Sequence, residues 1–206
     1  MDQQAPRPSM VVYERVRDEL NTGDLVLFEG TSFFSRLIQR ASGSKWSHVG
    51  MVMRLPEYDY LALYESTGGG ALRDLVSGVP TKGVQLVPLS EKIRTYPGRV
   101  AIRNLIDAGL IAEDFRALTE LRKELRGRPY EKSALELIRA AHDSPGEVTN
   151  EDLSSLFCSE LVAEAYQRLG LLTDRKPSNE YTPGDFGDRA GLQLERGHLD
   201  YEYELT

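Results

Sequence analysis

Three side chains in this sequence have the types needed for nucleophilic attack on an acyl carbon. Such a reaction needs a thiolate, an imidazole that exchanges protons with it, a third group that orients the imidazole, and donors for the oxyanion. The single cysteine, Cys158, together with His48 and Glu65, can supply the first three. The other histidines, His142 in a polar stretch and His198 near the chain end, are typical of surface residues. The sequence therefore indicates a thiol site, provided that the fold brings these three residues together.

The residues around Cys158 predict a helix. Apolar residues follow the cysteine at three- and four-residue spacing, namely Leu161, Val162, Ala165, Tyr166 and Leu169. Ser154 and Ser155 offer N-cap oxygens, so we expect the helix to begin immediately before Cys158. A cysteine in the first turn has its thiolate stabilised by free N–H groups and the helix dipole, and its own N–H can serve the oxyanion. The alternative is a structural thiol, because a free cysteine is often a small buried hydrophobe.

A predicted hairpin places the histidine and the glutamate. Residues 47–53 and 61–66 are typical of two strands, and alternate residues of a strand share a face. If the turn is residues 56–59, Glu65 stands opposite Gly50 and diagonal to His48 on the same face. A turn with an odd number of residues would separate the two side chains. The alternatives are a core histidine and a solvated carboxylate.

The remaining chain favours an α+β fold. Strands are expected at 25–28, 83–89 and 98–105, which with the hairpin gives an antiparallel sheet of about five strands packed against the cysteine helix. Residues 11–20 form a short helix or an extended lead-in. Further helices are expected at 33–41, 113–126 and 132–141, the second with Phe115, Leu118, Leu121 and Leu125 as its apolar stripe. We expect a flexible tail at 1–10 and one domain at 11–206, with 104–147 as a helical elaboration.

Composition excludes several classes of protein. The net charge of -7 argues against a nucleic-acid footprint and against strong binding to anionic membranes. One cysteine cannot form an internal disulfide, and no apolar run is long enough for a membrane span. The N-terminus lacks the pattern of a secretory signal, so we expect a cytoplasmic protein. We expect neither cofactor nor metal, and the oligomeric state stays open.

Four short blocks resemble a known family. FCSELVAEAY resembles the DCSGLVQ-type nucleophile motif of the NlpC/P60 papain-like cysteine hydrolases, TGDLVLF their PGDLVFF strand, SHVGMVM their HVGIYIG strand, and GRPYE their GxPY motif. In the ordinary family the cysteine precedes the other two strands, whereas here it follows them. This order resembles the circularly permuted YiiX/YaeF-like branch. A permuted chain can pack identically, because only the point of chain opening differs.

The resemblance implies roles for four residues. Cys158 matches the nucleophile, His48 the base, Glu65 the group that orients the base, and Tyr130 a tyrosine near the oxyanion or the substrate. The chain departs from the ordinary pattern in having CSE instead of CSG, and glutamate where many relatives have histidine. The implied fold is papain-like in permuted order.

Three functions follow as expectations. The first is a cysteine peptidase or amidase that cleaves an amide bond, on cell-wall-type peptides if the wider family is a guide. The second uses the same acyl-enzyme on a lipid or thioester, as hydrolase or acyltransferase. The third is a non-catalytic binding module. The expected partner is a peptide or an acyl-containing small molecule.

Overall fold

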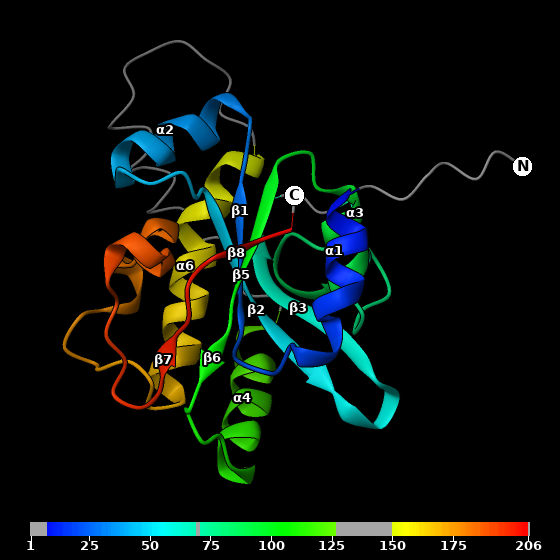
Figure 1. Cartoon of the computed structure of the whole chain (residues 1–206), viewed down its shortest axis with the longest axis vertical. Coiled ribbons are helices and arrows are strands. Elements are labelled where there is room, and N and C mark those ends of the chain that lie inside the picture. Colours follow the sequence, from blue (N-terminus) through cyan, green and yellow to red (C-terminus); the bar gives the residue numbers. More distant parts are fainter. Residues whose placement is uncertain (1–7, 69–70, 127–149, 206) are drawn as a thin grey trace, which may run out of the picture.

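A six-stranded antiparallel sheet forms the centre of the molecule (Figure 1). The computed structural model describes residues 8–68, 71–126 and 150–205. Strands β1 (Leu25–Glu29), β2 (His48–Leu55), β3 (Tyr60–Thr67), β4 (Gly83–Pro88), β5 (Arg99–Arg103) and β8 (Tyr203–Glu204) lie in the order β4-β3-β2-β1-β5-β8. The two short strands β6 (Leu105–Ile106) and β7 (His198–Leu199) pair separately. The five predicted strands are confirmed, and the acidic end of the chain adds β8 beside β5.

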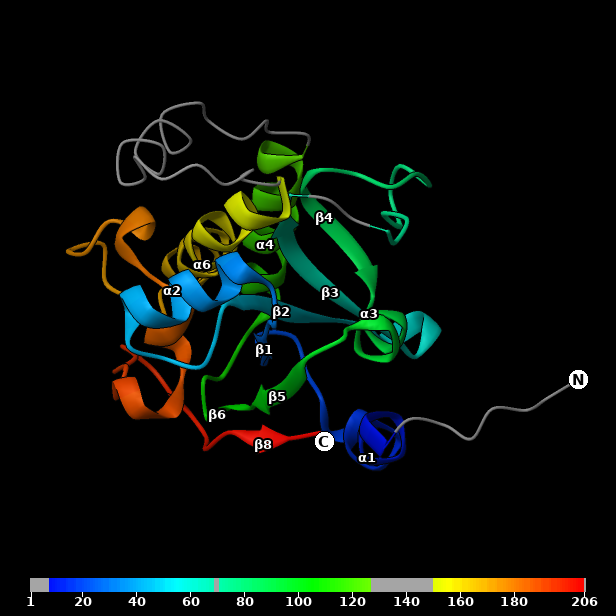
Figure 2. The same ribbon diagram turned by 90° about the horizontal axis from the view of Figure 1, so that it is seen from above.

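Helices cover both faces of the sheet (Figure 2). Helices α4 (Ala112–Leu125) and α6 (Asn150–Arg168) pack on one face, whereas α1 (Pro8–Val16) and α3 (Leu89–Thr95) lie on the other. The alternation of β1 explains the two layers, since Leu25 and Leu27 join the core cluster of α6 while Val26 and Phe28 join that of α3. The fold is therefore α+β, as predicted.

The predicted hairpin register is confirmed. Met51 pairs with Tyr64, and Leu55 pairs with Tyr60, which leaves the four residues 56–59 as the turn. The same register sets Gly50 opposite Glu65, so the side chains of His48 and Glu65 emerge on one face of the sheet.

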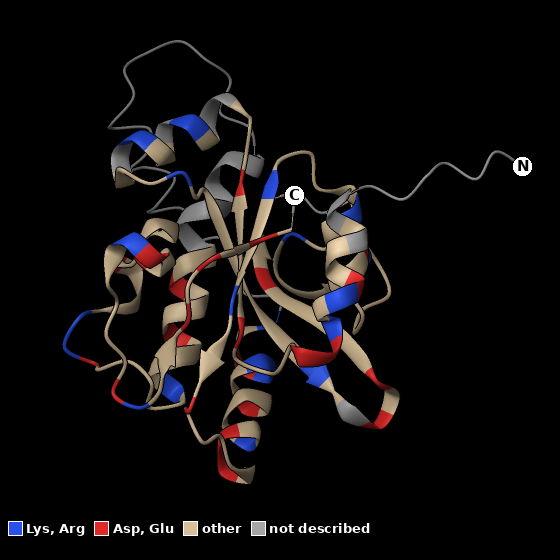
Figure 3. Ribbon diagram, viewed as in Figure 1, with Lys and Arg blue, Asp and Glu red and all other residues tan. Residues whose placement is uncertain are grey.

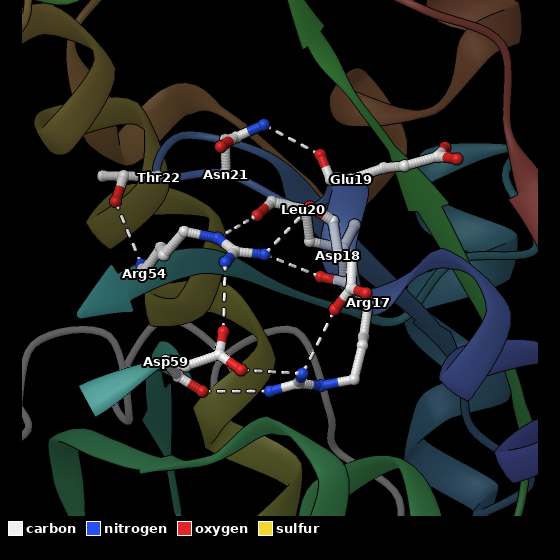
Figure 4. Close-up of polar contacts among 8 residues, drawn as sticks. All are labelled: Arg17, Asp18, Glu19, Leu20, Asn21, Thr22, Arg54 and Asp59. Atoms are coloured by element: carbon white, nitrogen blue, oxygen red, sulfur yellow. Dashed lines mark hydrogen bonds and ion pairs between the residues drawn. The ribbon is translucent and has the colours of Figure 1, made fainter. Parts of the chain in front are cut away.

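A polar network fixes the turn end of this hairpin (Figure 4). The Arg54 guanidinium donates from Nε to the Leu20 carbonyl at 2.7 Å and from Nη2 to the Arg17 carbonyl at 2.8 Å. Asp59, whose φ of 45° lies in the left-handed region, accepts from Arg17 at 3.2 Å and from Arg54 at 3.4 Å. These contacts tie the turn to the segment before β1, which favours one strand register over its neighbours.

Helix α2 (Phe33–Ser42) matches the helix expected at 33–41. The Ser32 hydroxyl accepts from the Ser35 N–H at 3.0 Å, and Gly43 ends the helix with a φ of 63°. Helix α2 contacts α6.

The start of the cysteine helix was predicted wrongly. Helix α6 begins at Asn150, more than two turns before Cys158, so the cysteine lies inside the helix. The predicted apolar face is correct, since Leu161, Val162, Ala165, Tyr166 and Leu169 are all buried.

Three other expectations need correction or lie outside the described residues. Pro8, expected in the flexible tail, begins α1. Phe115 is 45% exposed, although Leu118, Leu121 and Leu125 of the same predicted stripe are buried. Charged residues occupy much of the rest of α4 (Figure 3). Lys123 and Glu120 form an ion pair along it. The helix expected at 132–141, and with it much of the 104–147 elaboration, lies outside the described residues.

Among the described helices, none combines the length and apolar character needed to cross a membrane.

Candidate active site

His48 and Glu65 form a buried pair at the start of β2 and near the end of β3. The His48 Nε2 lies 2.6 Å from the Glu65 Oε2. The Glu65 side chain has no solvent exposure, and His48 is 8% exposed. A carboxylate on Nε2 fixes the ring orientation and leaves Nδ1 as the other ring nitrogen for a second partner.

Two further donors hold the Glu65 carboxylate. Gln85, opposite Glu65 on β4, donates from Nε2 to Oε1 at 2.8 Å. Lys92 of α3 approaches both oxygens, with Nζ 2.8 Å from Oε1 and 2.7 Å from Oε2. Burial alone would raise the pKa of Glu65, but the Lys92 charge and the hydrogen bond with His48 hold the pKa of this carboxyl well below its usual range. Glu65 is therefore ionised at neutral pH.

The Cys158 sulfur is the second partner of the imidazole. Burial alone would lower the pKa of His48, but the charge interaction and hydrogen bond with Cys158, together with Glu65, raise it from 6.5 to about 9. The Phe28 ring packs beside the imidazole with its centroid 5.3 Å away. His48 thus keeps its proton at neutral pH and lies between a sulfur and a carboxylate.

The site lies where the two layers of the molecule meet. Cys158 belongs to the core cluster on the α6 face of the sheet. His48 is the cross-strand partner of Phe28, which belongs to the cluster on the α3 face. Because His48 is the first residue of β2, its ring is within reach of both layers at the strand end.

The position of Cys158 inside α6 changes the electrostatic argument. Its N–H belongs to the hydrogen-bond ladder of the helix, so it is not an oxyanion donor. The field of the helix dipole is strongest in the first turn, which Cys158 does not occupy. The electrostatic partner of the sulfur is instead His48, whose pKa the sulfur helps to raise.

Three residues of this cluster were missed in the sequence. Lys92 and Tyr96 were missed because α3 was not expected after the strand at 83–89, although the polar residues that follow Pro88 signal the change. The Tyr96 ring centroid lies 4.8 Å from that of Phe28, and burial raises the pKa of Tyr96 while a hydrogen bond with Ser47 partly offsets the rise. Nothing in the residues around Gln85 indicates a role in the site, because its contact with Glu65 arises only from the pairing of β4 with β3.

Three candidates named in the sequence remain. Tyr130 and His142 are outside the described residues. His198 lies on β7 and is exposed, as expected. Within residues 8–68, 71–126 and 150–205, no three histidine, cysteine, aspartate or glutamate residues gather as a metal site requires.

Comparison with known proteins finds a likeness among solved structures. No protein-family model matches the chain, and no curated protein does. The chain is similar to the crystal structure of the metalloprotein YiiX from Escherichia coli O157:H7, with 21% sequence identity and a TM-score of 0.47 over 88% of this chain and 88% of that chain.

Proposed function

We propose that this protein is a cysteine hydrolase that cleaves an amide or peptide bond through an acyl-enzyme. The observation that carries the proposal is the contact series from Cys158 to His48 to Glu65, with the His48 pKa raised to about 9. A histidine that is protonated at neutral pH beside a sulfur favours the thiolate, which is the nucleophilic form.

The first half of the reaction forms the acyl-enzyme. The Cys158 thiolate attacks the carbonyl carbon, a C–S bond forms, and the carbonyl π electrons move to the oxygen. As the tetrahedral intermediate collapses, the C–N bond breaks and protonated His48 gives its proton to the leaving amine. Because Nε2 is held by Glu65, Nδ1 is the nitrogen that transfers the proton.

The second half returns the enzyme to its starting state. Neutral His48 takes a proton from water as the water oxygen attacks the acyl carbon, and the C–S bond then breaks. The products are a carboxylic acid, a thiolate and a protonated imidazole, so atoms and charge balance. Glu65 stays ionised and only orients the ring.

We further propose that the fold is papain-like in permuted order. The GDL strand β1 and the histidine strand β2 precede the cysteine helix α6 in the chain, yet they form the centre of the sheet on which α6 packs. This order and contact fit the four sequence blocks that resemble the NlpC/P60 hydrolases of the YiiX/YaeF-like branch.

The test is intact-mass analysis after exposure to three substrate sets: muropeptides, N-acyl amides, and acyl thioesters or esters. The expected result is an acyl adduct on wild type and none on Cys158→Ala, with release of free amine from a peptide or amide. Adducts from thioesters or esters alone would overturn the amide assignment in favour of a lipid-type acyl substrate.

A second measurement tests the thiol itself. Iodoacetamide should modify Cys158 faster than a model thiol at neutral pH, and His48→Gln should remove the advantage while circular dichroism stays native. A wild-type rate no greater than that of the model thiol would overturn the catalytic proposal and leave a binding module.

A further inference from the structure

Lys92 is the cationic partner of a fully buried carboxylate. Its Nζ lies 2.7 Å from one Glu65 oxygen and 2.8 Å from the other, and the Lys92 side chain is 15% exposed. The ammonium also lies 5.4 Å from the centroid of the Phe28 ring, the same ring that packs against His48. Lys92 therefore contacts both the carboxylate and the aromatic wall of the proposed site.

The proposed reaction explains why a second cation is needed. A buried carboxylate is stable as an anion only while an opposite charge or several donors compensate it. His48 supplies a positive charge in the resting state, but it becomes neutral when it gives its proton to the leaving amine. Lys92 takes no part in that proton transfer, so it compensates Glu65 at every step of the cycle.

We propose that Lys92 is a positioning residue that keeps Glu65 ionised and fixed, so that Glu65 continues to orient His48 throughout the reaction. The inference rests on the proposed cysteine hydrolase function. Lys92 acts through Glu65 and does not touch the reacting atoms.

The direction of the effect follows from the charges around Glu65. The titratable groups near it are His48 on β2, Lys92 and Tyr96 from the α3 segment, and Cys158 on α6. The Lys92 charge is the largest of the influences that lower the pKa of Glu65. Without the Lys92 charge, the pKa of Glu65 is higher, so Glu65 takes up its proton at higher pH. The acid limb of a reactivity profile is the part where the rate rises with pH. If reactivity needs ionised Glu65, this limb must then move to higher pH.

The experiment is the pH dependence of Cys158 alkylation by iodoacetamide in the full chain. For Lys92→Met we expect the acid limb to move up by about one pH unit, or roughly tenfold lower rate at a fixed pH on that limb. Lys92→Arg should restore the wild-type limb, because it keeps the charge. Arg94→Met, an exposed position in the same helix, is the matched control and should leave the profile unchanged.

A double variant separates this role from simple loss of structure. In a Glu65→Gln background the carboxylate is absent, so adding Lys92→Met should not move the limb further, and this protein lacks both buried charges and should fold. An unshifted limb in folded Lys92→Met, or an equal shift in both backgrounds, would overturn the role of Lys92 alone. A wild-type thiol no more reactive than a model thiol would overturn the proposed function and this inference with it.

Discussion

The Nε2 of His48 lies 2.6 Å from the Oε2 of Glu65, across a hairpin that separates the two residues by 17 positions. The pair is possible because four residues form the turn, which puts both side chains on one face of the sheet. The imidazole of this pair also interacts with Cys158, and the carboxylate also interacts with Lys92.

Replacing Glu65 by glutamine should reduce both activity and stability. The change leaves the partly buried Lys92 charge without its partner, so we expect the free energy of unfolding to fall by about 3 kcal/mol. The rate should fall by about a hundredfold or more, since the imidazole is no longer held for proton transfer. Denaturant unfolding and hydrolysis rates measure the two effects. Glu91→Gln, at an exposed position of α3, is the control, and equal losses in both variants would contradict the prediction.

The pKa of His48 should fall when the sulfur is replaced. Cys158 favours the protonated ring and helps to raise the pKa of His48 to about 9, so in Cys158→Ser the ring should lose its proton at lower pH. A ¹H–¹⁵N NMR titration measures this, with the His48 signals assigned by their loss in His48→Gln. An unchanged titration in Cys158→Ser would mean that sulfur and imidazole do not interact.

The hydroxyl of Tyr96 should stabilise the fold through its hydrogen bond with Ser47, separately from the packing of the ring. Tyr96→Phe keeps the contact with Phe28 at 4.8 Å but loses the hydrogen bond with Ser47. We expect a loss of about 1 kcal/mol in the free energy of unfolding. Tyr58→Phe, at a side chain that is 79% exposed, should be neutral, so a similar loss in both would remove the assigned role.

Arg103 should be required for the C-terminal segment to pack. Its guanidinium donates to the carbonyls of Phe186, Leu199 and Asp200 at 2.9, 3.0 and 2.7 Å, and it is 6% exposed. Arg103→Met leaves these acceptors without a donor, so we expect a loss of about 3 kcal/mol. Arg99→Met on the same strand, with a side chain 61% exposed, is the matched control. Hydrogen exchange should show faster opening near β8 in Arg103→Met alone.

Local patterns predicted the hairpin well because its register depends on few residues. Alternation from His48 to Val52 and from Leu61 to Glu65 defines the faces, and Pro56 to Asp59 closes the turn. The ends of α2 also depend on local residues, since serine is favoured at an N-cap and glycine just after a helix C-terminus, as at Ser32 and Gly43.

The start of α6 shows where local reasoning failed. Ser154 and Ser155 are good cap residues, but serine is also tolerated inside a helix when neighbouring residues favour it. The structure has helix α6 from Asn150, so both serines lie within it. The cysteine therefore meets His48 as a tertiary neighbour and does not lie at the end of its own helix.

The sequence by itself determined which residues have the chemistry of a thiol site and which strand face His48 and Glu65 share, because residue type and strand period are local properties. Only the tertiary structure decided that Cys158, from the helix on one face of the sheet, meets a ring from the other face at the strand end. It alone also brought Lys92 and Gln85 to Glu65. A buried charge is compensated by groups that are close in space, and the positions of those groups along the chain do not indicate that they are close.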